Sequence, residues 1–338
     1  MKFCHSLNLF FIQKRRINHN SFHITTPIFY VNSVPHIGHI YSALLADALF
    51  RWNLMRCGNS PNQPSPTNFY FSTGTDEHGK KIQDAANAKG LLPKDHCDVV
   101  SSMFMNVFKK FGIKYTRFTR TTSPEHIEAV NHFWNLLDKR GHISKRSYEE
   151  ENYAFDLSRF YEQIRNWANQ PGVIYQSHLI SYIDDFISKD SAAQISISRP
   201  ISRCSWGIPV PNDNSQTIYV WFDALVNYLT AVGYPKQIAS WPPTIQILGI
   251  DIFKFHAIYW PAFLLAADLP LPKKLLVHGH WLSGRRKMSK SLGNVFCPLK
   301  TAEITSVDGL RYFLLKQIPY EHGGWLIFYF QISTYVEF

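Results

Sequence analysis

The stretch PHIGHIYSALLADAL, from Pro35 to Leu49, constrains the fold more than any other part of the chain. The β-branched and aromatic residues 24–31 (ITTPIFYV) predict a strand before it, and Pro35 with Gly38 marks a turn. The apolar run after the turn predicts a helix that extends to about Trp52. A strand that passes through a short turn into a helix is the unit from which α/β folds are built.

The same alternation continues along the chain and predicts an α/β protein. We expect a Rossmann-like, doubly wound parallel sheet with covering helices, in which a ligand lies outside the carboxyl ends of the strands. Residues 142–160 predict two short strands around an acidic turn. Further predicted strands cover residues 68–73, 195–199, 217–222, 244–250 and 274–280, and further predicted helices cover residues 80–90, 97–112, 124–141, 161–170, 222–231 and 252–268.

Composition narrows the classes of function. The chain has 35 Lys and Arg against 25 Asp and Glu, and the resulting net charge of +10 favours a polyanionic partner such as nucleic acid. The five cysteines are scattered without a C-x-x-C pair, which argues against a zinc site and against a disulfide framework. No apolar run reaches the length of a membrane span, so we expect no membrane insertion.

The N-terminal residues 1–22 have a composition of their own. They contain Lys2, Lys14, Arg15 and Arg16, and no acidic residue occurs before Asp47. A basic, acid-poor and partly apolar segment resembles a mitochondrial transit peptide more than a secretory signal. An ordinary basic tail is the alternative interpretation.

His36 and His39 lie where the predicted helix begins. A helix N-terminus presents N–H groups and partial positive charge, which favour phosphate, and Gly38 leaves room for a close approach. The two histidines, three positions apart, would donate hydrogen bonds to a nucleotide phosphate chain. Taken alone, the pair is equally explained by two of the fifteen histidines falling near a helix start.

A second basic cluster, SGRRKMSKSLGN, follows the predicted strand 274–280. Lysines and hydroxyls on a loop bounded by Gly284 and Gly293 could close over a triphosphate and neutralise a leaving pyrophosphate. A solvated basic loop is the usual explanation of such a charge run when it stands alone.

The two motifs together, HIGH and KMSKS, resemble the paired markers of class I aminoacyl-tRNA synthetases. Within that class the sequence is similar to methionyl-tRNA synthetases, of the mitochondrial type. The resemblance covers roughly residues 24–317 with one gap, through TTPIFYVNSVPHIGHIYSALLADAL, STGTDEHGKKIQ, SWGIPVP, TIYVWFDALVNYLT, FKFHAIYWPAFLLA, KMSKSLGN and DGLRYFLL.

The resemblance implies a methionine–tRNA ligase that uses ATP and Mg²⁺, with methionine and tRNA(Met) as substrates, in the mitochondrial matrix. It implies catalytic roles for His36, His39, Lys287 and Lys290, and ATP contacts from these residues and from Gly38, Gly249, Asp251, Met288, Ser289 and Ser291. It implies a methionine site formed by Ile28, Tyr30, Asp76, Trp221, Ala224, Leu225, Tyr228 and His256, with Arg199 in support.

Two of these segments also have interpretations from their residues alone. GTDEHGKK nearly matches a phosphate-binding P-loop, but Lys81 stands where Ser or Thr is needed and two acids would repel phosphates. Asp76 at a strand end could instead receive an ammonium group. VWFDALVNYL on its pattern alone is core packing, although an aromatic pocket also suits a thioether. Ile250 replaces a lysine of most relatives, which puts one ATP or tRNA contact in doubt.

The predicted domain boundaries follow from two differences between this sequence and the family that it resembles. Compared with the family that it resembles, the chain is expected to lack the connective lobe between the two catalytic halves, near Tyr148–Glu151, and the anticodon-binding helical domain after DGLRYFLLKQ. The predicted division is a transit peptide at 1–22, the first catalytic half at 23–141, a reduced connective region at 142–190, the second catalytic half at 191–300, the start of a helical stem at 301–317 and a divergent tail at 318–338.

Two other functions remain open from the sequence. One is a catalytically silent, truncated isoform that binds ATP or tRNA, which the two differences favour. The other is a different HxGH nucleotidyltransferase with a small-molecule acceptor, which the KMSKS loop and the VWFDALVNYL segment speak against. The sequence leaves the oligomeric state unknown, with a monomer favoured.

Overall fold

The computed structural model of the chain describes residues 21–148, 150–189, 193–238, 240–283, 286–287 and 295–316. Its centre is a parallel sheet in the order β12-β11-β1-β3, with β4 on the far side of β3 and β2 paired to the end of β3 beside β1. The predicted α/β class with a parallel sheet is therefore confirmed. The six strands are β1 (Phe22–Thr25), β2 (Phe29–Tyr30), β3 (Phe69–Asp76), β4 (Arg117–Arg120), β11 (Ile245–Gly249) and β12 (Leu275–His278).

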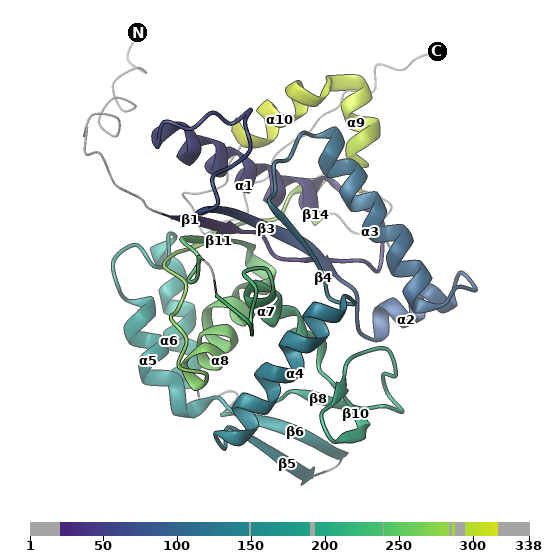
Figure 1. Cartoon of the computed structure of the whole chain (residues 1–338), viewed down its shortest axis with the longest axis vertical. Coiled ribbons are helices and arrows are strands. Elements are labelled where there is room, and N and C mark those ends of the chain that lie inside the picture. The colour runs from purple at the N-terminus through teal and green to yellow at the C-terminus, as the bar shows by residue number, and fades with distance from the viewer. Residues whose placement is uncertain are drawn as a thin grey trace.

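Helices cover both faces of this sheet, as the doubly wound arrangement requires. Figure 1 shows α1, α9 and α10 on one side of the sheet and α7 and α8 on the other. The helices are α1 (Ile37–Arg56), α2 (Lys80–Asn87), α3 (Pro93–Lys110), α4 (Pro124–Lys139), α5 (Tyr161–Ala168), α6 (Ile180–Ser188), α7 (Val220–Thr230), α8 (Trp260–Ala266), α9 (Pro298–Thr305) and α10 (Val307–Lys316). No described helix is long and apolar enough to cross a membrane.

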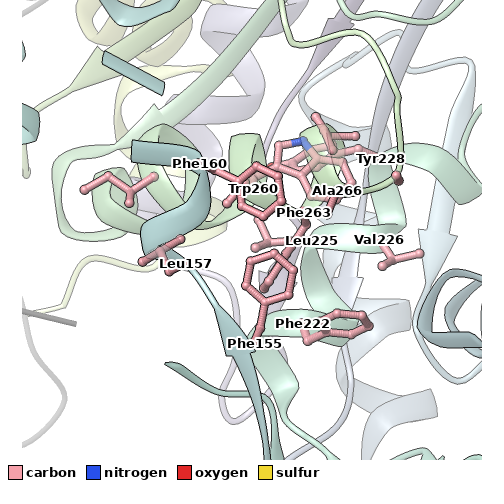
Figure 2. Packing of buried hydrophobic residues seen from close by; sticks show 14 of the residues in the cluster. Phe155, Leu157, Phe160, Phe222, Leu225, Val226, Tyr228, Trp260, Phe263 and Ala266 are labelled. Atoms are coloured by element: carbon pink, nitrogen blue, oxygen red, sulfur yellow. The ribbon is translucent and has the colours of Figure 1, made fainter. Parts of the chain in front are cut away.

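The sheet divides the apolar core into two clusters. Successive side chains of a strand point to opposite faces, so Leu275 and Val277 of β12 pack in one cluster and Leu276 packs in the other. Figure 2 shows part of the first cluster, where Phe155 of β6 (Glu150–Asp156) approaches the side chains of α7 and α8. The ring centroids of Phe155 and Phe263 are 4.8 Å apart at 86°. The strand that carries Phe155 thus belongs to the same core as α7 and α8.

The connective region contains the antiparallel hairpin that the sequence predicts. Strand β5 (Ile143–Tyr148) pairs with β6 (Glu150–Asp156), and β6 pairs with β7 (Gln194–Ser196). A second small sheet contains β8 (Ser198–Pro200), β9 (Pro209–Val210) and β10 (Asp213–Ile218). Beyond β12, the short strands β13 (Leu282–Ser283) and β14 (Arg286–Lys287) pair antiparallel.

Four predicted elements differ from the structure. The strand predicted at 195–199 is divided at Ile197 into β7 and β8, which belong to two different sheets. The strand predicted at 24–31 is split into β1 and β2, because Pro27 has no N–H with which to continue the ladder. The strand predicted at 217–222 ends at Ile218, and α7 begins at Val220. The helix forms here because the apolar residues of α7 recur at helical spacing and are buried. The helix predicted at 252–268 is interrupted by a π-helical turn, Phe255–Tyr259, before Pro261, whose ring nitrogen cannot donate to the preceding turn.

One buried ion-pair network fixes α1 relative to the end of the described chain. The Asp47 carboxylate on α1 is fully buried, and Arg311 of α10 donates to its Oδ2 atom at 2.6 Å. Arg51 donates to the same oxygen at 2.9 Å, and the backbone N–H of Lys114 donates to Oδ1 at 2.8 Å. Three donors therefore compensate one buried charge, and they hold the helix whose N-terminus enters the cavity described next.

Candidate active site

A cavity of about 640 Å³ opens at the carboxyl ends of the central strands. Strand order reverses between β1 and β11, and a doubly wound sheet places its ligand crevice at this reversal. The residues that line the cavity come from β2, the start of α1, the end of β3, α7 and the segments after β11 and β12. Thirteen residues predicted from the sequence are among them: Ile28, Tyr30, His36, Gly38, His39, Asp76, Trp221, Ala224, Leu225, Tyr228, Gly249, Asp251 and His256.

His36 and His39 form the N-terminal cap of α1. The Nδ1 atom of His36 accepts from the backbone N–H of Gly38 at 3.1 Å, and the Nδ1 atom of His39 accepts from the backbone N–H of His36 at 3.2 Å. The two rings stack with 3.6 Å between centroids. A Cβ atom at Gly38 would lie 3.0 Å from the His36 ring, so any other residue here would require the ring to shift by a few tenths of an ångström.

The cap also decides which nitrogen of each neutral ring carries the proton. Because Nδ1 accepts a hydrogen bond in both rings, the proton of the neutral form lies on Nε2, on the side of the ring opposite the helix. His39 also packs against the stacked rings of Phe29 and Phe104, with centroid separations of 5.4 and 5.2 Å. A helix N-terminus with two oriented imidazoles at the edge of the cavity is suited to an anion.

Asp76 stands at the end of β3 with one carboxylate oxygen in an unusual position. The residue is 8% exposed, and its buried Oδ1 atom has no hydrogen-bond partner among the described residues. Burial, followed by the negative charge of Asp223, raises the pKa of Asp76 well above its usual value, while the backbone N–H of His78 opposes the rise. A buried carboxyl with an unused oxygen at a cavity wall is suited to a ligand that brings a positive charge.

Aromatic side chains form the deeper part of the cavity. The Tyr228 hydroxyl lies 2.7 Å from Nε2 of His256, whose Nδ1 atom lies 3.0 Å from the Ile252 carbonyl oxygen. Burial lowers the pKa of His256 to about 4, so its ring is neutral at neutral pH, with Nδ1 donating to the carbonyl and Nε2 accepting from Tyr228. Trp221 stacks on Phe255 at 3.6 Å and 6°. These rings form a wall without net charge, which suits an apolar or thioether side chain.

Sequence reasoning missed His278, the last residue of β12. Its Nε2 atom lies 2.7 Å from the Ser42 hydroxyl on α1, and its Nδ1 atom lies 2.8 Å from the Gly279 carbonyl oxygen. Both Ser42 and His278 line the cavity. Burial lowers the pKa of His278 to about 4. The sequence offered two signals. His278 lies within the predicted strand 274–280, and Ser42 follows His39 by three residues.

A second missed cluster lies behind the cavity wall. The Asp223 carboxylate of α7 accepts from Nδ1 of His78 at 2.7 Å and from Nε2 of His126 at 2.6 Å. His126 belongs to α4, and its Nδ1 atom lies 2.8 Å from the Thr230 hydroxyl. All four side chains are buried. Although burial opposes it, the charges of His78 and His126 and their hydrogen bonds lower the pKa of Asp223 to about 2.

Arg199 and the KMSKS residues lie elsewhere. Arg199, on β8, is not part of the cavity wall; its guanidinium lies 4.1 Å from the ring centroid of Tyr219, which does line the cavity. Lys287 contributes its backbone to β14. The remaining residues predicted for the loop lie outside the described part of the chain: Met288, Ser289, Lys290 and Ser291.

Comparison with known proteins gives three consistent findings. A family model described as tRNA synthetases class I (M) matches residues 22–150 and 147–326, in two parts that meet at the turn between β5 and β6. The mitochondrial methionine–tRNA ligase of Xenopus laevis is 46% identical over 86% of this chain and 58% of its own length. The human mitochondrial methionine–tRNA ligase is 45% identical over 87% of this chain and 56% of its own length.

The solved structures agree with the sequence matches. Methionyl-tRNA synthetase of Mycobacterium tuberculosis bound by methionyl-adenylate superposes with a TM-score of 0.77 at 32% identity, covering 87% of this chain and 64% of that one. The chain thus spans less than two thirds of the length of each of these relatives.

Proposed function

Because the chain belongs to the methionyl-tRNA synthetases of class I, we propose that it activates methionine with ATP and transfers the methionyl group to tRNA(Met). One observation carries the proposal. The residues predicted for ATP and those predicted for methionine come from five separate parts of the chain, yet thirteen of them line one cavity at the reversal of strand order.

Methionine would lie with its ammonium group at Asp76 and its thioether against the aromatic wall. The unused Oδ1 atom of Asp76 is the acceptor that an ammonium needs. Tyr30 of the neighbouring strand β2 pairs with Asp76, and Ile28, just before β2, also lines the cavity. Trp221, Ala224, Leu225, Tyr228 and His256 would enclose the side chain. Selection then rests on shape, where one methylene is worth about 1–3 kcal/mol.

ATP would lie with its phosphates at the start of α1. The Nε2–H groups of His36 and His39 would donate to the phosphates, with Gly38, Gly249 and Asp251 close to the nucleotide. The methionine carboxylate attacks the α-phosphorus, the bond to the β-phosphate breaks, and pyrophosphate leaves with the negative charge. We propose that Lys287 and Lys290, with Met288, Ser289 and Ser291 around them, neutralise that charge, as donors aimed at developing charge do in general.

Mg²⁺ would accompany ATP rather than occupy a site built by the protein. Among the described residues no three side chains of His, Cys, Asp or Glu converge to hold a metal ion. Mg²⁺ commonly keeps several waters and binds substrate phosphates with one or two carboxylates, so this arrangement fits an ion delivered with the nucleotide. When bound, the ion would supply positive charge to the phosphate chain.

The second step would use the terminal adenosine of the tRNA. Its 2′-hydroxyl attacks the methionyl carbonyl, the anhydride bond to AMP breaks, and AMP leaves. Arg199 would act on this chemistry indirectly, because its guanidinium packs on the Tyr219 ring at the start of α7. We further propose the mitochondrial matrix as the location, in agreement with the mitochondrial relatives.

The proposed domain division follows the sequence expectation. The catalytic halves are 23–141 and 191–300, joined by a reduced connective region at 142–190, with a helical stem from 301 to 317. Strand β1 begins at Phe22, which is buried and pairs with Phe69. The predicted boundary after residue 22 therefore separates the first residue of β1 from the rest of the strand. The predicted transit peptide, apart from its last two residues, and the predicted tail at 318–338 lie outside the described part of the chain.

The test is methionine-dependent exchange between ATP and pyrophosphate on the purified chain. We expect exchange with methionine and not with leucine or valine, and its loss in His36→Ala. A folded preparation that shows no exchange with methionine would contradict the proposal and favour a silent protein that binds ATP or tRNA. Equal exchange with all three amino acids would contradict the assignment of the aromatic wall.

A further inference from the structure

The substrate site proposed above has two ends that are built by different halves of the chain. Asp76 ends β3 in the first half, whereas Trp221, Ala224 and Leu225 belong to α7 in the second half. Methionine would span both ends. Discrimination by length therefore requires a fixed separation between Asp76 and α7, and this separation needs a physical link.

The segment after Asp76 is held firmly on the side of the sheet. Glu77 is fully buried, and Arg120 donates to its two carboxylate oxygens at 2.7 and 3.0 Å. The Trp206 indole N–H donates to the Glu77 carbonyl oxygen at 2.6 Å. Gly79 then turns the chain with φ +103°, a conformation that favours glycine. These contacts fix the segment on the side of the sheet, and Gly79 lies close to the side chain of Val220 at the start of α7.

His78 makes the connection to α7. Its backbone N–H lies close to the Asp76 carboxyl and opposes the rise in the pKa of that group, and its imidazole Nδ1 atom donates to Asp223 at 2.7 Å. Asp223 lies between the cavity-lining residues Trp221 and Ala224 of α7. One residue thus touches both the proposed ammonium acceptor and the helix that carries the proposed thioether wall.

Asp223 is itself held from a third element. His126 of α4 donates to its second oxygen at 2.6 Å and also contacts Thr230 at 2.8 Å, near the other end of α7. The side chains of His78, Asp223 and His126 are each at most 6% exposed. A carboxylate that is buried with two imidazole donors costs much to rotate or to leave unpaired, so the link is rigid.

Resting on the function proposed above, we infer that His78 is a positioning residue that, through Asp223 and His126, sets the separation between the ammonium acceptor Asp76 and the methionine side-chain wall on α7. His78 is not in contact with the cavity, and the inference assigns it no contact with substrate. Its effect is therefore on methionine and on length discrimination, and not on ATP.

Substitution of a histidine by Asn or by Gln gives a matched pair of variants, one that keeps the hydrogen bond to Asp223 and one that displaces it. The amide nitrogen of Asn lies close to the position of a histidine Nδ1, and that of Gln lies close to the position of Nε2. His78→Asn therefore keeps the donor to Asp223, and His78→Gln displaces it. The pattern reverses at the second histidine, where His126→Gln keeps the donor to Asp223 and His126→Asn displaces it. His132→Gln is the control on the same helix, since the Nδ1 atom of His132 contacts the Tyr234 hydroxyl at 2.7 Å rather than Asp223.

The measurement is ATP–pyrophosphate exchange with methionine and with homocysteine. We expect His78→Gln and His126→Asn to raise the KM for methionine about tenfold, as for loss of a hydrogen bond to a charged group, with the KM for ATP within about twofold. The preference for methionine over homocysteine, as the ratio of kcat/KM values, should fall about fivefold, a part of what one methylene is worth. His78→Asn, His126→Gln and His132→Gln should keep the KM and the preference within about threefold.

Other results would overturn the inference in distinguishable ways. An unchanged KM for methionine and an unchanged preference in both displaced-donor variants would overturn it while the proposed function stands. Equal rises in the KM for methionine and for ATP would show general loosening, which also overturns it. Absence of exchange in the unmodified chain would overturn the proposed function and this inference with it. The His126 pair acts at a distance from Asp76, so it tests the link even where a His78 variant does not fold.

Discussion

The imidazole rings of His36 and His39 lie one over the other with 3.6 Å between their centroids, and each Nδ1 atom accepts a backbone N–H of the first turn of α1. The same two side chains therefore cap a helix and orient two Nε2–H donors. The capping role and the proposed catalytic role belong to the same pair, and a substitution that preserves only one of the roles can separate them.

Replacing His36 by Asn tests this separation. Asn is a good N-cap residue, so His36→Asn should keep the thermal stability, whereas His36→Ala should lose about 1 kcal/mol. Both variants lack the Nε2 donor, so both should reduce kcat for ATP–pyrophosphate exchange about 10²–10³-fold, the usual cost of one preorganised donor. Thermal unfolding and exchange rates measure the two effects. Recovery of exchange by the Asn variant to within tenfold of the unmodified chain would contradict the catalytic role.

The buried carboxylate of Asp76 should lower the stability of the folded chain, although it is needed for methionine binding. Burial and then the charge of Asp223 raise its pKa in the folded state, so the folded chain binds the proton more tightly than the unfolded chain does. The contribution to stability is thus present at low pH and is lost as the pH rises through the folded-state pKa. Asp76→Asn removes the buried charge, and we expect a Tm about 2 °C higher at pH 8, with a smaller difference at pH 5.

The same variant should bind methionine much more weakly. An uncharged amide cannot pair with the ammonium group, and loss of a buried charge pair costs about 2–5 kcal/mol, or roughly 30-fold or more in affinity. For the unmodified chain, methionine affinity should rise with pH as Asp76 ionises, because only the carboxylate attracts the ammonium. Calorimetric titration from pH 5 to 8 checks both statements. A pH-independent affinity in the unmodified chain would argue against Asp76 as the acceptor.

Tyr228→Phe should weaken the methionine site from within the aromatic wall. The substitution removes the hydroxyl 2.7 Å from Nε2 of His256 and leaves a buried ring nitrogen without its donor, at a cost of about 1–3 kcal/mol. We expect lower stability and a higher KM for methionine, with the KM for ATP unchanged. Leu225→Ala, which opens the same wall without removing a hydrogen bond, is the comparison. A Tyr228→Phe variant with unchanged stability would show that the hydrogen bond contributes nothing.

The chain should lose stability steeply in mild acid. Burial lowers the pKa values of His23, His256 and His278 to about 4, so the folded state binds fewer protons than the unfolded state. Each ring has a pKa of 6.5 in the unfolded chain. The stability associated with each neutral ring is therefore fully present above pH 6.5 and is lost as the pH falls towards 4. Each ring accounts for about 3 kcal/mol over that interval.

His23 offers the cleanest measurement, because it lies outside the cavity. His23→Gln should flatten the curve of unfolding free energy against pH between 6.5 and 4. Denaturant unfolding at half-unit steps of pH gives the two curves. Parallel curves for the variant and the unmodified chain would contradict a neutral buried ring at this position.

Local patterns predicted most of the elements correctly. The apolar periods of α1 and α4 and the apolar run of β12 are properties of short segments, and the predicted strands and helices match them to within a few residues. Strand β4, Arg117–Arg120, was not predicted because only Thr119 of its four side chains is buried and no apolar alternation marks it. Its place in the sheet depends on pairing with β3, which a local pattern does not encode.

The sequence by itself determined the α/β class, the helix that begins at His36, the family through the HIGH and KMSKS motifs, and the residues expected around ATP and methionine. Only the tertiary structure decided the reversal of strand order beside β1, the cavity that unites thirteen of those residues, and the partners of the buried histidines. His78 meets Asp223 across 145 residues and Ser42 meets His278 across 236. Contacts over such separations are set by the packing of the whole sheet and its helices, so no spacing along the chain reveals them.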